Sequence, residues 1–176
     1  MKRWVPLCLF FLAACGVRGS DPWVCYFGPE VSGEKLDGYG LVILEPDHFK
    51  SVRHLRSPSK IAYLSVGECG TYRSYWPRVK GKPWVGAENP NWPGDIAVDI
   101  RSEEWRSLLL KEAIPGIVEK GFNGLFLDTL NEAVAGELME THGSEGKIAA
   151  LIDFISAVRR DYPGLKIISN NGVRSF

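Results

Sequence analysis

Five short runs of apolar residues, separated by segments of helical character, constrain the fold of this chain more than any other feature. The runs do not alternate with polar residues, a pattern typical of parallel strands that are covered on both faces. Alternation of strand and helix predicts right-handed βαβ units and a parallel sheet, so the predicted fold class is α/β. The runs cover residues 23–28, 41–44, 60–68, 124–129 and 166–172.

Two helices are predicted from periodic apolar positions. The first follows Ser102, a residue suited to an N-cap, and ends near Gly121, with a kink expected at Pro115. The second covers about residues 145–162 and is stopped by a Pro-Gly pair. Its apolar stripe has the period of an α-helix and consists of Ile148, Leu151, Ile152, Ile155 and Val158.

Two shorter segments show a weaker hydrophobic pattern than these two helices. A short helix is expected from Asp47 through Leu55. Residues 96–100 are compatible with a strand, but we favour an extended lead into the helix that follows Ser102.

The first twenty residues are interpreted as an export signal. Lys2 and Arg3 precede an apolar stretch over 4–14 that is too short to span a membrane. The small residues before Cys15 resemble a bacterial lipobox, in which the cysteine is lipidated; ordinary cleavage nearby is the alternative. We therefore divide the chain into 1–20, a leader with a lipobox ending at Cys15 and a short linker, and 21–176, the folded domain. The expected location is the cell envelope, in the outer membrane and periplasm or on the cell surface.

Charge and cysteine content exclude several classes of function. The chain has 21 basic and 21 acidic residues, so it lacks the positive surface that nucleic-acid binding requires. No glycine-rich phosphate loop supports a nucleotide fold. Cys25 and Cys69 could pair in an oxidising compartment or remain free and buried. Because no Cys/His spacing suggests zinc, we expect no metal and no other cofactor.

Polar residues occur where the apolar runs end. Asp128 lies directly on an otherwise buried run, Glu68 ends the third run and Asn170 ends the fifth. In a parallel α/β barrel the active site is built at this end of the strands. Asp128 and Glu68 are therefore candidate catalytic carboxylates, and Asn170 is a candidate substrate-binding residue. The alternative is that strands simply end in polar loops, which accounts for Asp47 as a helix cap.

A long segment over 72–94 combines aromatic residues with Pro, Gly, Arg and Lys and shows no helical period. Aromatic faces flanked by hydrogen-bonding groups suit the C–H faces and hydroxyls of sugars. The alternative is that these residues only pin a long loop to its own domain. Taken together they favour a carbohydrate ligand over a small acid or a nucleotide: Tyr72, Tyr75, Trp76, Trp84 and Trp92.

Six blocks of this sequence resemble the endo-α-1,4-polygalactosaminidase family of exported glycoside hydrolases with a TIM-barrel fold. The resemblance implies a (β/α)8 barrel that acts on an amino-sugar polysaccharide. The lipobox at Cys15 predicts that the chain contacts the membrane through the lipid anchor only, and nothing in the sequence identifies a protein partner. It also implies that Asp128 is a catalytic carboxylate, with a partner glutamate on a later strand. The expected substrate-binding residues are Tyr26, Trp92, Asn170 and Asp99. The blocks are 24–28, 62–68, 88–94, 98–101 with Trp105, 120–129 and 167–172.

The sequence departs from that family pattern in length. A complete barrel takes about 250 residues, whereas about five of the eight strands can be identified here. We expect an incomplete barrel, produced by a truncated gene or an interrupted reading frame, with little activity. Glu68 is then either the second carboxylate or a ligand for a sugar hydroxyl or amine, and the spacing does not distinguish retention from inversion. The alternative function is a lipid-anchored, non-catalytic polysaccharide-binding protein or a truncated pseudoenzyme.

Overall fold

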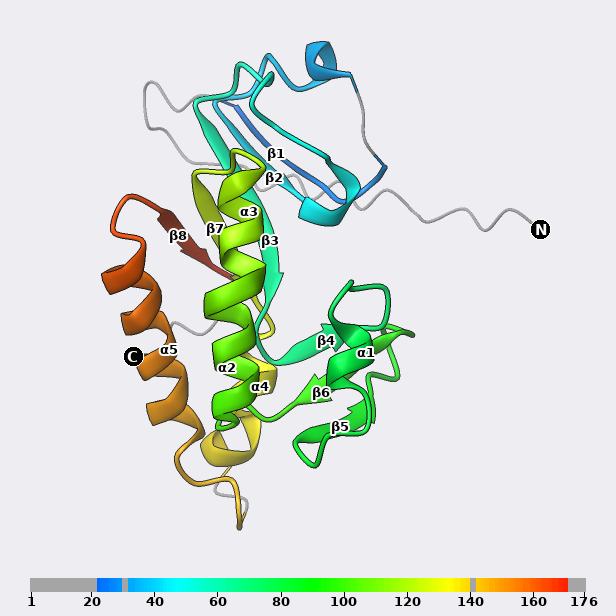
Figure 1. Ribbon diagram of the computed structural model, residues 1–176, viewed down its shortest axis with the longest axis vertical. Helices are drawn as coiled ribbons and strands as arrows, with labels where there is room; N and C mark the ends of the chain where they lie inside the picture. The colour runs from blue at the N-terminus through cyan, green and yellow to red at the C-terminus, as the bar shows by residue number, and fades with distance from the viewer. Residues whose placement is uncertain (1–21, 30–31, 140–141, 171–176) are drawn as a thin grey trace, which may run out of the picture.

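A computed structural model describes residues 22–29, 32–139 and 142–170. The leader over 1–20, with Cys15, lies outside these residues, so its assignment stays a prediction. The main layer is a parallel sheet in the order β1-β2-β3-β7-β8 (Figure 1). Its strands are β1 (Trp23–Tyr26), β2 (Leu41–Leu44), β3 (Ser59–Ser65), β7 (Gly124–Asp128) and β8 (Lys166–Ser169).

All four strand pairings in this sheet are parallel, which confirms the predicted α/β class. The five strands of this sheet form an open arrangement with β1 and β8 at its edges, as in part of a barrel. The third predicted run was too long: β3 ends at Ser65, and Glu68 belongs to a different sheet.

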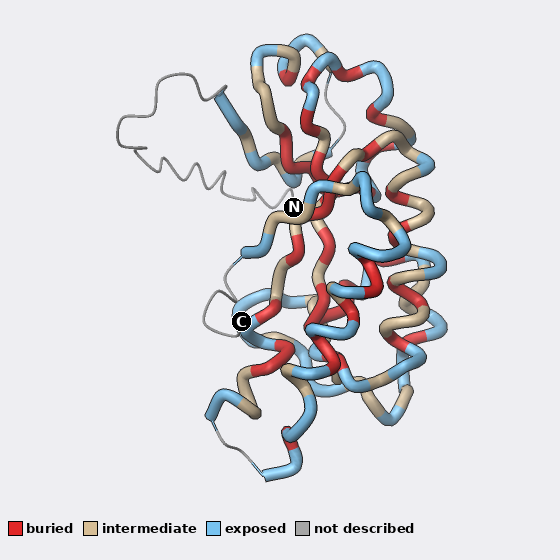
Figure 2. The backbone as a smooth tube through the Cα atoms, turned by 90° about the vertical axis from the view of Figure 1, so that its left-hand side faces the viewer, coloured by how far each residue is buried: buried red, intermediate tan, exposed pale blue. Residues whose placement is uncertain are grey.

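The two faces of the parallel sheet differ in burial. Leu44, Leu64 and Leu127 point to one face and are almost completely buried in the main core. The other face carries Tyr63 and Phe126, which neighbour each other in the register and are only partly buried, beside Ile43 and Ile61, which are buried but lie outside the main core. Figure 2 shows the buried stretches concentrated in the central strands and in the helix faces that pack on them. The second face therefore resembles the inside of a barrel.

One long helix covers the buried face and consists of α2 (Glu103–Leu108), a π-helical turn over Leu109–Ala113 and α3 (Ile114–Glu119). Ser102 caps it, because its hydroxyl accepts a hydrogen bond from Trp105 N–H at 3.2 Å. The predicted kink at Pro115 is replaced by the π-turn, and the helix runs on through the proline (Figure 1).

The π-turn also resolves the hydrogen bonding around Pro115. Leu109 O accepts from Ile114 N–H, so the next carbonyl, that of Leu110, would need an N–H that Pro115 lacks. The hydroxyl of Tyr162 donates to Leu110 O at 3.2 Å and satisfies it.

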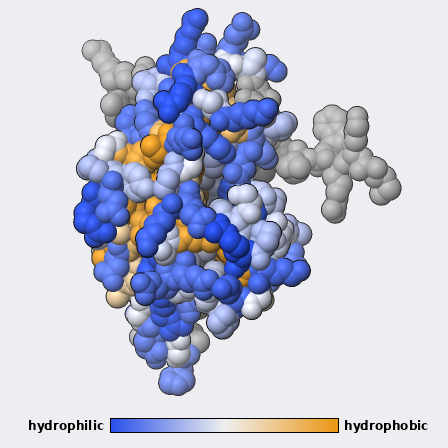
Figure 3. All heavy atoms as spheres, viewed as in Figure 1, coloured by the Kyte–Doolittle hydropathy of each residue, from blue (hydrophilic) through white to orange (hydrophobic). Residues whose placement is uncertain are grey.

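Hydrophobic patches lie near the middle of the molecular face that Figure 3 shows, over α2, α3 and α5, within a mostly hydrophilic surface.

The second predicted helix is α5 (Lys147–Asp161), and it packs against α4 (Leu130–Leu138), which the sequence analysis did not identify. Its buried stripe differs in part from the predicted one. Ile152 is 42% exposed, whereas Phe154 is buried. The packing face consists of Ala150, Leu151, Phe154, Ala157 and Val158.

A smaller lobe interrupts the alternation after β3. It is an antiparallel sheet in the order β4-β6-β5, with a short helix α1 (Trp76–Val79) beside it (Figure 1). Its strands are β4 (Glu68–Gly70), β5 (Val85–Glu88) and β6 (Asp95–Val98). Residues 72–94 are therefore not an irregular loop throughout. The segment starting at Ile96 belongs to a strand, which corrects the extended lead.

The helix predicted over 47–55 is also wrong. Only a single 3₁₀ turn forms there, η2 (Pro46–His48), while a second such turn, η1 (Gly33–Lys35), precedes β2. Phe49, Val52 and Leu55 are buried from a non-helical segment, which Val52 N–H anchors by donating to Lys120 O at 2.8 Å. Cys25 and Cys69 are free, so they do not pair. Across the described ranges, no helix combines the length and apolar character needed to cross a bilayer.

Candidate active site

Asp128 is the last residue of β7 and lies at the carboxyl end of the parallel sheet. Asn170, directly after β8, donates a hydrogen bond from Nδ2 to Asp128 Oδ1 at 2.7 Å. Tyr63 lies on the same sheet face; burial raises its pKa far above the ordinary value, and the negative charge of Asp128 and a hydrogen bond between the two side chains add to the effect. The structure thus brings together two predicted residues, Asp128 and Asn170, and adds Tyr63.

The turn after Asp128 is strained. Thr129 has φ of 60° and ψ of 27°, a left-handed conformation that costs of order 1–3 kcal/mol in a residue other than glycine. Its hydroxyl accepts hydrogen bonds from Gly67 N–H at 2.7 Å and Val66 N–H at 3.1 Å. Thr129 was not singled out in the sequence, because a β-branched residue gives no signal for this conformation.

Two further carboxylates lie near Asp128. Glu68 is buried and accepts a hydrogen bond from Asn89 Nδ2 at 2.7 Å. Burial raises the pKa of Glu68, the Asn89 hydrogen bond opposes that shift, and the charges of Asp95 and Asp128 add to it. Burial also raises the pKa of Asp95; Arg73 opposes the rise, whereas the charges of Glu45 and Asp128 support it. The charges of Asp95, Glu132 and Asp128 therefore all act on Glu68 at this end of the molecule.

Asp95 was missed in the sequence because its segment was not assigned to a strand. In the structure Asp95 is the first residue of β6 and pairs with Gly70 of β4. This register brings it close to the carboxyl end of the parallel sheet. No pattern in a single sequence distinguishes this aspartate from those in surface loops.

A buried ion pair supports one side of the site, where the main sheet meets the antiparallel lobe. Arg73 Nη1 lies 2.5 Å from Glu45 Oε1 and 2.7 Å from Asp47 Oδ2, and Arg73 Nη2 lies 3.0 Å from Glu45 Oε2. The side chains of Arg73 and Glu45 are only 6% and 5% exposed. The hydroxyl of Tyr72 also donates to Glu45, at 3.3 Å. This cluster joins the end of β2 to the start of the antiparallel lobe and fixes their relative position.

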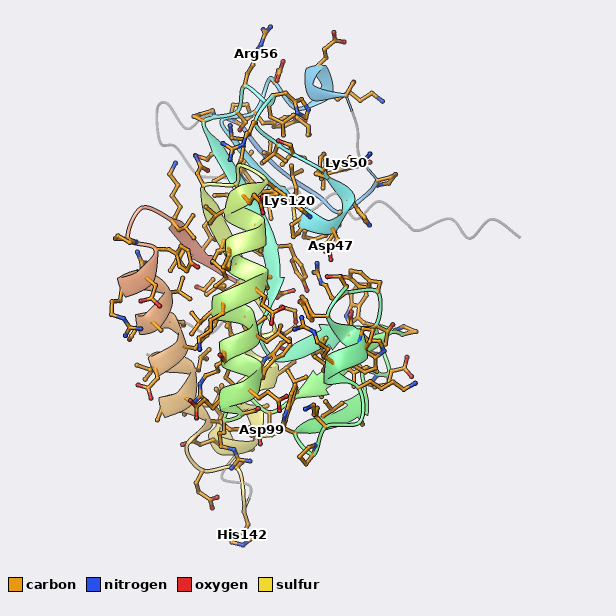
Figure 4. All side chains as sticks on the ribbon, in the orientation of Figure 1. Asp47, Lys50, Arg56, Asp99, Lys120 and His142 are labelled. Atoms are coloured by element: carbon orange, nitrogen blue, oxygen red, sulfur yellow. The ribbon has the colours of Figure 1, made fainter. Side chains whose placement is uncertain are left out.

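Asp47 has a second basic neighbour, Lys120, at the end of the long helix. Their Nζ and Oδ1 atoms are 3.7 Å apart, and Lys120 Nζ also donates to Pro46 O at 2.7 Å (Figure 4). The predicted capping role of Asp47 is taken by Glu45, whose side chain accepts from Asp47 N–H at 3.1 Å.

The other predicted binding residues have contacts and exposures of their own. The hydroxyl of Tyr26 donates to Pro29 O at 3.0 Å. Trp92 is 66% exposed in the connection between β5 and β6. Asp99 forms an ion pair with Arg101 at 2.5 Å, and the hydrogen bonds from Arg101 keep its pKa below the usual range. Asp99 lies at the end of the long helix opposite to Lys120 (Figure 4).

The ion pair with Arg101 gives Asp99 a structural role. The guanidinium donates to Gly143 O at 2.9 Å and to Glu145 O at 3.2 Å, and so connects the start of α2 to the segment before α5. In the described part of the chain, no group of three or more His, Cys, Asp and Glu side chains is arranged to hold a metal ion. The arrangement around Asp128 is instead that of carboxylates held by neutral donors, which suits acid–base chemistry.

Comparison with known proteins gives the context of this geometry. A family model described as glycoside-hydrolase family GH114 matches residues 42–175. The glycoside hydrolase domain of PelA from Pseudomonas aeruginosa is 28% identical, with a TM-score of 0.73, and the match covers 88% of this chain and 61% of that one. Ega3 of Aspergillus fumigatus, solved in complex with galactosamine, is 16% identical with a TM-score of 0.68, covering 89% and 62%; this likeness shows the fold alone.

A relative is also found among curated sequences. An uncharacterized protein of Thermotoga maritima is 27% identical over 194 residues, which cover 93% of this chain and 59% of that protein. The chain thus spans about three fifths of the length of each of these three proteins.

Proposed function

The chain belongs to glycoside-hydrolase family GH114, and from that premise we propose that it acts in the hydrolysis of glycosidic bonds in a galactosamine-containing polysaccharide. The observation that carries the proposal is Asp128, which ends a parallel strand and is held by Asn170 at 2.7 Å. A carboxylate in this position of a barrel-type sheet faces the region where substrates bind.

Glycoside hydrolysis requires two carboxyl groups with different tasks. One donates a proton to the leaving oxygen, while the other attacks the anomeric carbon or activates a water molecule. We assign the second task to Asp128, because its Oδ1 is already fixed by a neutral donor. The resemblance to polygalactosaminidases implies that the proton donor is a glutamate on a later strand.

Glu68 and Asp95 suit recognition of the substrate amine. Burial disfavours their charged forms, and at Glu68 repulsion from the charge of Asp95 adds to the rise in pKa. A bound ammonium group relieves that repulsion, so a cationic sugar gains more from this pair than a neutral one does. N-acetylation of the amine removes the positive charge and therefore removes this gain.

Exposed aromatic residues extend the surface on which a polymer can bind. Trp92 is 66% exposed and Tyr72 is 57% exposed, and both belong to the antiparallel lobe. Their faces can stack on sugar rings that lie beyond the reacting bond. This surface also favours the second candidate function, a non-catalytic polysaccharide-binding protein.

The test compares Asp128→Asn and Glu68→Gln, with the exposed Asp153→Asn as the matched control. Release of reducing ends from polygalactosamine and from its N-acetylated form is measured together with binding. We expect Asp128→Asn to abolish hydrolysis while binding persists, and Glu68→Gln to weaken binding of the free-amine polymer alone. Hydrolysis at the wild-type rate by Asp128→Asn contradicts the assignment. Binding without any release of reducing ends by the wild-type chain supports the binding function.

Export and lipid anchoring through Cys15 are a separate proposal, supported by the basic and apolar pattern of residues 1–20. Incorporation of a labelled fatty acid into the wild-type chain, and its loss in Cys15→Ala, is the expected result. Equal labelling of both chains contradicts it.

A further inference from the structure

Thr129 is the one non-glycine residue with a positive φ among those that the structure describes. A β-branched side chain rarely adopts this conformation, and it persists only where the surroundings enforce it. Thr129 directly follows Asp128. The most strained backbone position known in this chain is therefore the neighbour of the proposed catalytic carboxylate.

The Thr129 hydroxyl is the centre of the contacts that enforce this conformation. It accepts from Gly67 N–H at 2.7 Å and Val66 N–H at 3.1 Å, and donates to Asp128 O at 2.6 Å. Ser65 Oγ lies 2.8 Å from the same oxygen, and because the single Thr129 hydroxyl hydrogen goes to Asp128 O, the Ser65 hydroxyl is the donor in that pair. One side chain thus connects the end of β3 to the end of β7.

The backbone on both sides of the turn is fixed as well. Asp128 O accepts a further hydrogen bond from Val66 N–H at 3.0 Å. Thr129 O accepts from Ala133 N–H at 3.0 Å and so begins α4. The fit leaves no space, because a Cβ on Gly67 would lie 2.5 Å from Thr129 O. With its backbone held at these points, Asp128 retains only its side-chain torsions.

We propose that Thr129 is a positioning residue, whose hydroxyl holds the left-handed turn and thereby keeps the Asp128 carboxylate on Asn170. This inference rests on the proposed function, in which Asp128 acts on the sugar. If Thr129 only connected β7 to α4, any residue at this position would serve. A positioning role requires the hydroxyl itself.

Three variants of the full chain separate these roles. Thr129→Val keeps the branched shape but removes the hydroxyl, and leaves Gly67 N–H without its acceptor. Thr129→Ser keeps the hydroxyl. Thr129→Gly accepts the left-handed conformation without strain and also lacks the hydroxyl, so it tests the role even if Thr129→Val does not fold.

The first measurement needs no substrate. The two side-chain amide resonances of Asn170 are followed by NMR in the wild type and in all three variants. We expect both signals to be preserved in Thr129→Ser. In Thr129→Val and Thr129→Gly the Asn170 amide should shift toward the values of a free asparagine, because the carboxylate is no longer held.

The second measurement is hydrolysis. In Thr129→Gly and Thr129→Val we expect kcat to fall about tenfold to a hundredfold with little change in KM, whereas Thr129→Ser stays within about threefold of the wild type. Wild-type NMR signals or a wild-type kcat in Thr129→Gly would overturn the proposal. If the wild-type chain does not hydrolyse the polymer, the proposed function fails, and the Asn170 signals alone decide the role of Thr129.

Discussion

Asn170 Nδ2 donates to Asp128 Oδ1 at 2.7 Å although the two residues are 42 positions apart in the chain. The contact depends on the pairing of β7 with β8, in which Leu127 lies opposite Ser169. The register of β7 against β8 therefore determines where Asn170 lies relative to Asp128. A carboxylate oriented before the substrate arrives needs little reorganisation during the reaction.

Substitution of Asn170 tests this orientation. We expect Asn170→Ala to lower kcat about tenfold to a hundredfold, because the carboxylate can then rotate away from its productive direction. Steady-state hydrolysis of the polymer measures the change. Asn170→Asp serves as the second variant, since a second carboxylate at this distance should raise the pKa of the pair and move the pH optimum upward. An unchanged rate in Asn170→Ala contradicts the orienting role.

The buried pair of Arg73 and Glu45 should dominate stability near the site. Arg73→Met leaves the Glu45 carboxylate buried without its cation, which is expected to cost about 3–5 kcal/mol. Denaturant unfolding measures this loss. The matched control is Arg78→Met, which removes an exposed, solvent-screened pair with Glu112 and should change stability little. The double variant Glu45→Leu with Arg73→Met should recover much of the loss; similar losses in Arg73→Met and Arg78→Met would refute this account.

The raised pKa of Glu68 makes stability depend on pH in a defined direction. Below the ordinary value of 4.5 the carboxyl is protonated in both states, so burial carries no penalty there. As pH rises from that value through the raised pKa of the folded state, the folded state is progressively destabilised, and above it the penalty is constant. Glu68→Gln should therefore gain stability over the wild type as pH rises from about 4.5 through the raised pKa of the folded state.

Thermal unfolding of both chains across this pH range gives the measurement. Asn89→Ala is the companion variant, because loss of its hydrogen bond should raise the pKa of Glu68 further and move the window upward. A stability difference between Glu68→Gln and the wild type that does not change with pH would show that Glu68 ionises alike in both states.

Two glycines should respond in opposite ways to alanine. In Gly67→Ala the new Cβ would meet Thr129 O at 2.5 Å and Ala133 N at 2.8 Å, so we expect a loss of about 1–3 kcal/mol. Gly116 lies inside α3 with nothing within 4 Å of the added atom, and Gly116→Ala should gain about 0.5–1 kcal/mol. Equilibrium unfolding compares the two. A tolerated Gly67→Ala would mean that the turn at Thr129 can move.

The parallel strands could be predicted because burial on both faces produces continuous apolar runs. β2, whose sequence is Leu-Val-Ile-Leu, has no polar position that could obscure this signal. The antiparallel lobe could not be predicted in the same way. Three of the four residues of β5 are exposed, so the strand follows from pairing with β6 and not from a hydrophobic pattern.

The site was predictable only in part. Asp128 and Asn170 were found because each ends a recognisable run. Arg73 and Glu45 are 28 positions apart, and nothing in a single sequence indicates that they meet in the interior. Thr129 is a different case, because local preference argues against the conformation it adopts; such conflicts between local preference and the whole fold are expected at functional positions.

The antiparallel lobe begins and ends at neighbouring points, between β3 and the long helix, since Val98 N–H donates to Gly67 O at 2.9 Å. A segment whose two ends meet in this way can be lengthened, shortened or exchanged at small entropic cost to the remainder of the fold. Evolution can therefore vary the exposed surface that contains Tyr72 and Trp92 with little change to the strand that carries Asp128. The same junction offers protein engineers a place at which to graft a different recognition module.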